Sequence, residues 1–380
     1  MPKLPLARKG KRLVVAKAPV EFSYFPTYQG DRRAGMHTKV YTTDAWAVIK
    51  SAIRQLCPMA DRPTAAAFAD QAEEFYRAAA NAQTHHGRPL LLYYAFMNLA
   101  KALCLHRGNR NVLGKAQHGL EDHNNHAADL TVANVKAFPT VLNAQGSRGS
   151  KLNIYHEFLM SASGTGLTGP QTYKMRDVLA SSLIGHRLWT EAVVSEDRFL
   201  KLVSVEIMHG VVSKTLWLRV HINKSSLSKH GLTQTTVTNG GFGPGWKSVR
   251  LRSLAHSGIA VWEQTQPVTY TGRPSDQLET LAATARGVFY RSLTTSEPFR
   301  NYYVYVPPTG YAKPHQLASR YMLLYFLGSV TRYHPADFAT YLDGKFGPFI
   351  AEFLASEPSQ GLFEMACLFA KREVVTVGLA

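Results

Sequence analysis

A polar stripe runs along one otherwise apolar segment of this 380-residue sequence. The segment RPLLLYYAFMNLAKALCLHRG, residues 88–108, carries Tyr94, Asn98 and Lys101 at the i, i+4, i+7 spacing of one helix face. A hydroxyl, an amide and an ammonium group in one row can bind an anion together. The stripe is therefore a candidate site, and an anion is its expected ligand.

A second apolar segment, residues 322–332, repeats the pattern with Tyr325, Ser329 and Arg332. A cation in an apolar helix must reach solvent, pair with an acid or face a water-filled cleft, because an unpaired buried charge is costly. The first two outcomes would make the stripes part of the architecture. The third would make Lys101 and Arg332 two sides of one anion cleft. We favour architecture, and the cleft remains the alternative.

Arg332 and His334 stand two residues apart at the predicted end of the second segment. A guanidinium group can polarise a phosphate and an imidazole can move a proton, so this pair is the catalytic candidate. Two other pairs have a longer spacing but lie outside the predicted helices: Arg32 with His37 and Arg250 with His256. No complete catalytic motif is present, and whether the protein is an enzyme stays open.

The polar segment HGLEDHNNHAAD, residues 118–129, contains three histidines that are weak candidates for metal ligands: His118, His123 and His126. Imidazole suits zinc, manganese or iron. Glycine and asparagine make this segment a poor helix, however, and histidine is common in exposed polar loops. We therefore expect no metal site here.

Motifs that would hold a cofactor are missing. The sequence has no GxSxG, no HExxH and no Rossmann glycine fingerprint. The glycine-rich TNGGFGPGWK, residues 238–247, lacks the GK[ST] of a phosphate-binding loop and is predicted to be a turn. Three widely spaced cysteines without a CxxC pair are typical of a reducing cytoplasm: Cys57, Cys104 and Cys367. We expect a cytoplasmic protein with no cofactor.

Alternating apolar and polar residues predict a half-buried strand over residues 214–224. Its apolar positions would face the core, and Trp217, Arg219 and His221 would face outward. A neighbouring strand would add Lys247, Arg250 and Arg252. Cations around an aromatic ring can neutralise phosphates while the ring stacks on a base. This face is the candidate site for RNA or single-stranded DNA; the alternative is a face that is solvated or covered by helices.

The charge balance supports a polyanionic partner. Lysine and arginine number 43 against 26 aspartate and glutamate, a formal net charge of +17 with a pI near 9.8. Residues 1–20 contain six basic side chains and no acid, so we expect a solvated tail, with a phosphate-contacting arm as the alternative. No secretory signal and no membrane span are predicted. A basic protein without any polyanionic partner is the remaining interpretation.

Periodicity elsewhere predicts an α+β protein in which a helical hairpin and C-terminal helices pack around or beside an antiparallel β layer. Thr43 and Asp44 are the predicted N-cap candidates for the first helix. Residues 172–189 and residues 358–375 are each predicted to form one helix. Four regions result: a basic N-terminal arm over 1–40, a mainly helical region over 41–190, a β-rich region over 191–310, and a C-terminal helical region over 311–380 that packs back on the first.

The run from QAEEFYRAA through RPLLLYYAFMNLAKAL, the HGL that follows, and the distal SRYMLLYFLGSVTRYHP resemble the bacterial YaaC-like family, over roughly residues 65–355. That family has no established activity to carry over. The resemblance implies a bacterial or phage-related cytoplasmic protein, a helical part similar to HEPN-type folds, and a role in anti-phage defence. The spacing of Arg332 and His334 departs from the motif of HEPN-type ribonucleases, which puts nuclease activity in doubt.

The sequence therefore predicts a basic protein that binds nucleic acid, either RNA or single-stranded DNA. A ribonuclease or other phosphodiester or anion hydrolase is one alternative. A structural subunit that docks an acidic protein partner is the other. No membrane partner is expected, and the sequence indicates neither substrate nor oligomeric state.

Overall fold

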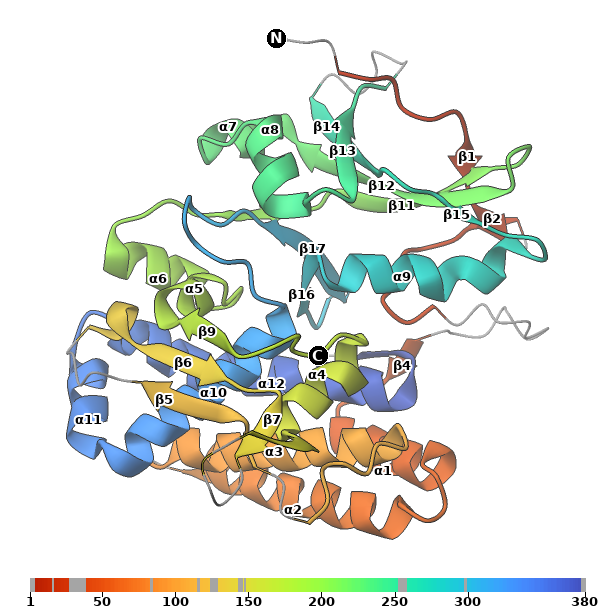
Figure 1. Cartoon of the computed structure of the whole chain (residues 1–380). Coiled ribbons are helices and arrows are strands. Elements are labelled where there is room, and N and C mark those ends of the chain that lie inside the picture. Colours follow the sequence, from red (N-terminus) through yellow and green to blue (C-terminus); the bar gives the residue numbers. More distant parts are fainter. Residues whose placement is uncertain are drawn as a thin grey trace. The chain divides into compact units, whose positions relative to one another are not determined.

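The computed structural model describes residues 4–15, 17–26, 39–82, 85–114, 117–123, 129–142, 146, 148–251, 258–296 and 299–376. The chain divides into two compact units (Figure 1). The helical unit comprises Thr43–Ser195 and Pro314–Val374, and the β-rich unit comprises Met1–Thr42, Glu196–Lys313 and Val375–Ala380. The predicted α+β class is confirmed.

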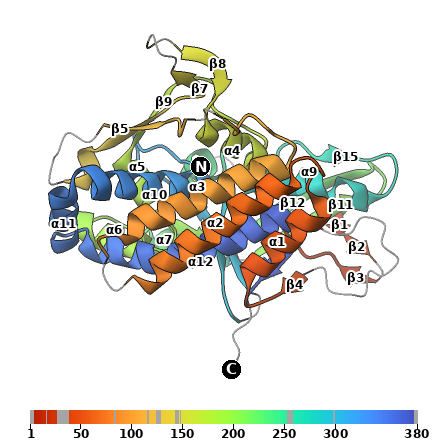
Figure 2. The same cartoon turned by 90° about the horizontal axis from the view of Figure 1, so that it is seen from below.

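Three helices open the helical unit: α1 (Ala45–Leu56), α2 (Arg62–Asn81) and α3 (Arg88–His106). Of the two predicted N-cap candidates, Asp44 caps the first helix, and its Oδ1 accepts a hydrogen bond from the Trp46 N–H at 2.9 Å. α2 and α3 lie side by side as a hairpin (Figure 2). α3 is buried nearly all round, which explains its apolar composition.

α10 (Gln316–Tyr333) packs along α3, and α11 (Pro335–Asp343) follows it. Gly328 makes this contact close: a Cβ atom there would lie 3.2 Å from the Cβ of Tyr93. A larger side chain would push the two helices apart. The glycine therefore sets the distance between the two segments that carry the polar stripes.

α12 (Gly347–Ala370) differs from the predicted helix over residues 358–375, because it begins well before Pro358. The helix continues through the proline. Its neighbour Glu357 is buried and accepts a hydrogen bond at 2.7 Å from Arg320 Nε, so tertiary contacts outweigh the lost backbone hydrogen bond. The predicted helical end instead forms strand β18 (Glu373–Val375).

Residues 172–189 also differ from the prediction of one helix. They contribute to strand β9 (Gln171–Lys174) and to two short helices, α5 (Met175–Ala180) and α6 (His186–Val193). The Ser181 hydroxyl donates to the Val178 carbonyl at 2.9 Å, where α5 ends. Serine competes with the helix for backbone hydrogen bonds in this way.

Small strands and helices complete the helical unit. β5 (Leu120–His123), β6 (Asn134–Ala137) and β9 form an antiparallel sheet in that order. The other elements are the 3₁₀ turn η1 (Leu130–Val132), the hairpin of β7 (Thr140–Leu142) and β8 (Arg148–Leu152), and helix α4 (Ile154–Ser163).

The main sheet of the β-rich unit has the order β1-β11-β12-β14-β13, with β15 also paired to β12. All of its strand pairs are antiparallel. The strands are β1 (Lys11–Arg12), β11 (Ser204–Gly210), β12 (Thr215–Asn223), β13 (Trp246–Val249), β14 (Ile259–Gln264) and β15 (Val268–Thr269).

A second sheet has the order β10-β17-β16.

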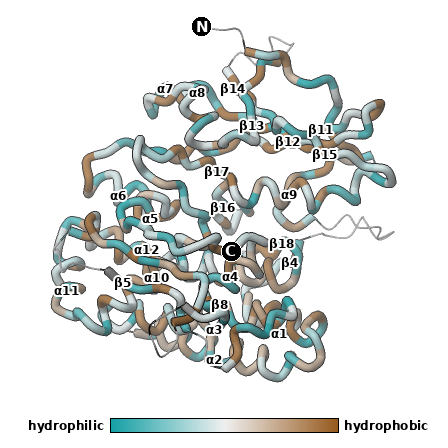
Figure 3. Tube along the Cα trace, viewed as in Figure 1, coloured by the Kyte–Doolittle hydropathy of each residue, from teal (hydrophilic) through white to brown (hydrophobic). Residues whose placement is uncertain are grey.

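Apolar and polar stretches alternate along the chain in both units (Figure 3). The predicted turn over 238–247 contains a π-helical turn instead, η2 (Val237–Phe242). The remaining elements are β2 (Val14–Val15), β3 (Ala18–Pro19), β4 (Lys39–Tyr41), β10 (Phe199–Lys201), α7 (Lys224–Lys229), α8 (Gln234–Thr236), η4 (Pro274–Gln277), α9 (Leu278–Arg286), β16 (Phe289–Leu293) and β17 (Arg300–Tyr305).

The N-terminal segment is a strap across the main sheet rather than a solvated tail. Leu6 bridges Arg250 beyond β13, the Arg8 N–H donates to Glu263 on β14, and Gly10 lies against a ring of β12. Lys11 then pairs with β11. The strap thus crosses the sheet from one edge to the other, because its backbone and Arg8 satisfy polar groups on that face.

Candidate functional site

α3 and α10 bring the two polar stripes into contact. The Arg332 guanidinium donates a hydrogen bond from Nη1 to the Tyr94 hydroxyl at 3.0 Å. The rings of Tyr93 and Tyr325 meet edge to face, with centroids 5.4 Å apart. The cation of one stripe therefore reaches the hydroxyl of the other.

His118 lies beside this contact. Its Nδ1 is 2.7 Å from the Tyr93 hydroxyl. Burial lowers the pKa of His118, and the positive charges of Lys101 and Arg332 lower it further. The Lys101 ammonium is 5.1 Å from the centre of the Phe68 ring, and partial burial lowers its pKa.

Tyr94, Lys101, His118 and Arg332 together form what we call the basic cluster. None of its three basic groups forms an ion pair with an acid among the residues that the structure describes. Lys101 is half-buried and Arg332 is exposed, so a bound anion would find two cations that no described acid neutralises. The cluster has the charge and the hydrogen-bond donors to hold a phosphate.

Asn98 does not belong to this cluster, contrary to its predicted place in an anion cleft. Its side chain is only 3% exposed, and its Nδ2 donates to Gln71 Oε1 at 2.8 Å. The amide therefore joins α3 to α2. It satisfies a buried polar group, which is the architectural role that the sequence left open.

Tyr325 and Ser329 line a separate pocket of about 300 Å³. Its other lining residues are Leu120, Glu121, Asp122, Tyr333 and His334. The Tyr325 hydroxyl donates to the Leu120 carbonyl at 2.9 Å, and burial together with the negative charges of Asp122 and Glu121 raises its pKa. The pocket therefore presents carboxylates beside hydroxyl and imidazole groups, which makes it unsuited to a bare anion.

Arg332 and His334, the catalytic candidates, lie at the junction of these two features. Arg332 donates to Tyr94, and its guanidinium carbon is 5.0 Å from the centre of the Tyr333 ring. His334 lines the pocket at the turn where α10 ends and α11 begins. Tyr333 is the one residue between them, and it is 61% exposed. It contacts the Arg332 guanidinium and also lines the pocket, so it lies between the basic cluster and the pocket.

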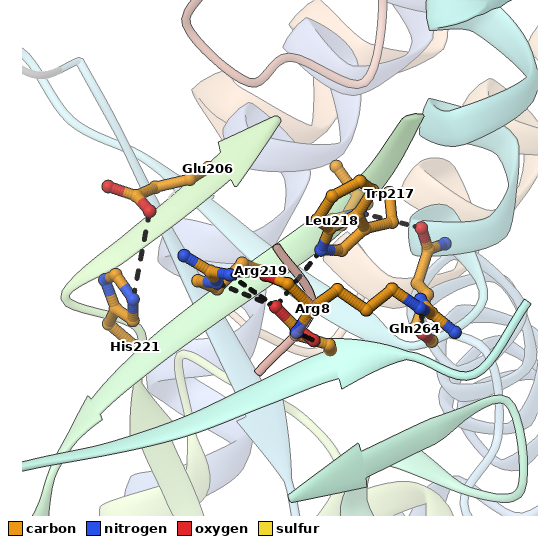
Figure 4. A network of polar contacts seen from close by, with 8 residues as sticks. Arg8, Glu206, Trp217, Leu218, Arg219, His221 and Gln264 are labelled. Atoms are coloured by element: carbon orange, nitrogen blue, oxygen red, sulfur yellow. Dashed lines mark hydrogen bonds and ion pairs between the residues drawn. The ribbon is translucent and has the colours of Figure 1, made fainter. Parts of the chain in front are cut away.

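The predicted nucleic-acid face of the main sheet is not an exposed surface. Trp217 is 1% exposed and donates from Nε1 to Glu263 Oε1 at 3.1 Å. Arg219 donates to the same carboxylate from Nε at 2.9 Å and Nη2 at 2.6 Å. The Arg8 N–H donates to its other oxygen at 3.0 Å (Figure 4). The N-terminal strap therefore covers this face.

His221 is likewise buried in this face, with its Nδ1 at 2.8 Å from Ser204 Oγ and its Nε2 at 3.9 Å from Glu206 (Figure 4). Lys247 is half-buried. Arg250 is exposed, but its backbone is tied to the strap. These residues belong to the structure of the sheet and do not form one basic surface.

Several predicted residues fall outside the described part of the chain. They are Arg32, His37, His126, Arg252 and His256, together with the side chain of His123. Of the suggested metal ligands only His118 is placed, and it contacts Tyr93. The described residues contain no group of three or more histidine, cysteine, aspartate or glutamate side chains arranged to hold a metal ion.

Sequence reasoning missed Glu121 and the aromatic residues of this site, whereas Asp122 was noted only as a possible partner of the candidate metal-binding histidines. Glu121 and Asp122 lie in strand β5, but the neighbouring glycine and asparagine residues are typical of a loop, so the sequence did not predict a strand here. Tyr93 was hidden next to Tyr94 in an apolar run. Tyr333 lies directly between the two catalytic candidates in the sequence. Its position at the predicted end of a helix was the signal that could have indicated an exposed ring.

The chain that builds this helix pair and small sheet matches a known family. Residues 36–369 match the YaaC-like protein family, nearly the whole chain. The chain is therefore a member of the YaaC-like protein family, as its sequence motifs indicated. No curated protein and no solved structure matches it. No helix formed by the described residues is both long enough and apolar enough to cross a membrane.

Proposed function

We propose that this YaaC-like protein binds single-stranded nucleic acid, RNA or DNA, through the basic cluster. The observation that carries the proposal is the hydrogen bond from exposed Arg332 to Tyr94 of the other stripe, with neither Arg332 nor Lys101 paired with an acid in the described residues. Phosphate is the anion that such a group fits best, since Arg332 offers a planar set of donors and Lys101 a point charge.

The exposed ring of Tyr333 favours nucleic acid over a small free anion. The ring stacks against the Arg332 guanidinium and leaves 61% of the residue open to solvent. Aromatic rings next to cations bind single strands by stacking on a base while the cations neutralise the backbone. Phosphate and base would thus be held by neighbouring residues of one helix end.

A second group of cations supports a polyanionic ligand. The strap of the β-rich unit exposes Lys9, Lys11, Arg12 and Lys17, and none of them pairs with an acid in the described residues. With the net charge of +17, these side chains would strengthen attraction to any nucleic acid in a salt-dependent way. These four side chains, and not the predicted face with Trp217 and Arg219, are the exposed basic groups that we propose for this unit.

Equilibrium binding of fluorescently labelled single-stranded RNA and DNA tests the proposal. Lys101→Glu with Arg332→Glu should weaken binding by more than tenfold, because two phosphate contacts become repulsive. Arg54→Glu, at an exposed position of α1, is the matched control and should bind like the parent. Parent-like affinity of the double variant would overturn the proposal. Ultraviolet absorbance of the purified protein would additionally reveal bound nucleic acid, which a subunit that docks an acidic protein would lack.

Ribonuclease activity is the second candidate, favoured by the position of His334. The imidazole shares a pocket with Glu121 and Asp122, and Arg332 lies two residues away in the sequence. A carboxylate near an imidazole is a common arrangement for proton transfer. Cleavage of labelled RNA by the parent but not by His334→Ala would support this activity. A phage-plating assay with the same variants would test the proposed defence role.

A further inference from the structure

We infer that the helical unit binds one buried water molecule in a polar cavity lined by α5, the turn that follows it, α10 and α12. The cavity leaves about 10 Å³ for the centre of a water molecule. A single water requires roughly 10–15 Å³ by this measure, so the cavity has room for one water and for nothing larger. The cavity shares no residue with the basic cluster, and the inference does not depend on the proposed function.

The Ser182 hydroxyl is the observation that points to a ligand. Ser182 is 7% exposed and lines the cavity, and its Oγ has no hydrogen-bond partner among the described residues. A buried hydroxyl without a partner raises the free energy of the folded state. A water molecule in the cavity would supply the missing hydrogen bond.

Other polar groups of the lining can hold the same water. Arg320 on α10 and Glu357 on α12 form a buried ion pair in which Nε donates to Oε2 at 2.7 Å. Their remaining atoms Nη2 and Oε1 form no hydrogen bond with any described residue. The Ser319 hydroxyl, 3.1 Å from that of Ser181, also lines the cavity. Buried waters bind about two to four such groups, because water both donates and accepts.

The charges around the cavity favour a neutral ligand over an ion. The guanidinium group of Arg320 would repel a cation, and the carboxylate groups of Glu357 and Glu364, which both pair with it, would repel an anion. Cavities that stay empty are lined by apolar groups, whereas this lining includes three serine side chains. Water is the neutral ligand that fits both the size and the polarity.

The water would join segments that lie far apart in the sequence. Ser182 belongs to the turn after α5, where the predicted helix over 172–189 is interrupted. Arg320 and Glu357 belong to the two long C-terminal helices. A water shared by these three residues ties the turn to the buried ion pair, and so stabilises the end of α5 in this position.

Ser182→Ala tests the inference by the sign of its effect on stability. If a water bridges Ser182 to the ion pair, the variant loses a hydrogen bond, and its midpoint of unfolding in urea should fall below that of the parent. If the cavity is dry, the variant removes a buried hydroxyl that has no partner, and the midpoint should stay or rise. Ser195→Ala, at an exposed position, is the matched control and should unfold like the parent.

A high-resolution crystal structure of the parent protein gives the direct measurement. We expect electron density for one water within hydrogen-bond distance of Ser182 Oγ. A cavity without such density would overturn the inference. An unchanged or raised midpoint of Ser182→Ala would overturn it as well, because the hydroxyl would then have no bound partner to lose.

Discussion

The Arg332 guanidinium donates a hydrogen bond to the Tyr94 hydroxyl, 3.0 Å away, and so joins the end of α10 to the middle of α3. The positive charge of Arg332 also contributes to the lowered pKa of His118, which favours the neutral imidazole. A hydrogen bond from a charged donor is stronger than one between neutral groups, so the contact fixes the guanidinium. Tyr94 is thus a positioning residue for the basic cluster.

Tyr94→Phe should weaken binding of single-stranded RNA about threefold, the equivalent of one modest hydrogen bond, because Arg332 loses its fixed orientation. The free energy of unfolding should change by no more than about 1 kcal/mol, since the ring stays in place. Fluorescence anisotropy and urea titration measure the two effects. Unchanged RNA affinity would show that the contact does not position Arg332 for binding.

Glu263→Gln should lower the free energy of unfolding by about 3 kcal/mol, because Glu263 is fully buried and is the shared acceptor for Trp217, Arg219 and the Arg8 N–H. The strap should also detach more often, so proteases should cut the first 20 residues faster. Glu206→Gln, which alters a more exposed acid on the same sheet, is the control. Parent-like stability of Glu263→Gln would contradict this account of the strap.

Arg320→Met should destabilise the helical unit by about 3–5 kcal/mol. The Arg320 side chain is 4% exposed and pairs with both Glu357 and Glu364, so its removal leaves two acids without their cation. Thermal unfolding followed by circular dichroism measures the change. The comparison is Arg77→Met, whose side chain lies on the surface of α2 and pairs with Glu73; it should unfold like the parent.

Acid should destabilise the protein through His106. Burial and the nearby charge of Arg107 lower the pKa of His106 to about 4, and its Nε2 lies 2.9 Å from the Phe369 carbonyl. The unfolded chain takes up this proton below about pH 6.5, whereas the folded chain takes it up only near pH 4. Stability is therefore complete above pH 6.5 and falls as the pH drops towards 4, by roughly 3 kcal/mol in total.

Urea titrations of the parent and of His106→Gln between pH 4 and 7 measure this effect. The glutamine variant keeps a donor for the Phe369 carbonyl and removes the titrating group. Its stability should depend less on pH than that of the parent. The same slope in both proteins would assign the acid sensitivity to other groups.

Local patterns predicted the helices of this fold well. The Asp44 cap and the apolar run of α3 are both set by neighbours in the sequence, and both were anticipated. The continuous helix through Pro358 was not, because it depends on the ion pair of Glu357 with Arg320, a residue 37 positions away. Propensity alone could not show that partner.

The site was predicted in part for the same reason. The alignment of Tyr94 with Tyr325 compared two helices that do pack together, and Arg332 of the second reaches Tyr94 of the first. Strand alternation also identified Trp217 and Arg219 as neighbours on one face. It could not show that Arg8, 211 positions away, accepts from Arg219 through its backbone carbonyl and covers that face.

The salt dependence of RNA binding tests the central claim most directly. For single strands, the logarithm of the affinity falls with the logarithm of the salt concentration by about 0.7 for each phosphate contact. The account predicts that Lys101→Glu with Arg332→Glu has a shallower slope than the parent by about 1.4, while Arg54→Glu keeps the parent slope. Identical slopes for the parent and the double variant would contradict the claim that the basic cluster holds the backbone of a nucleic acid.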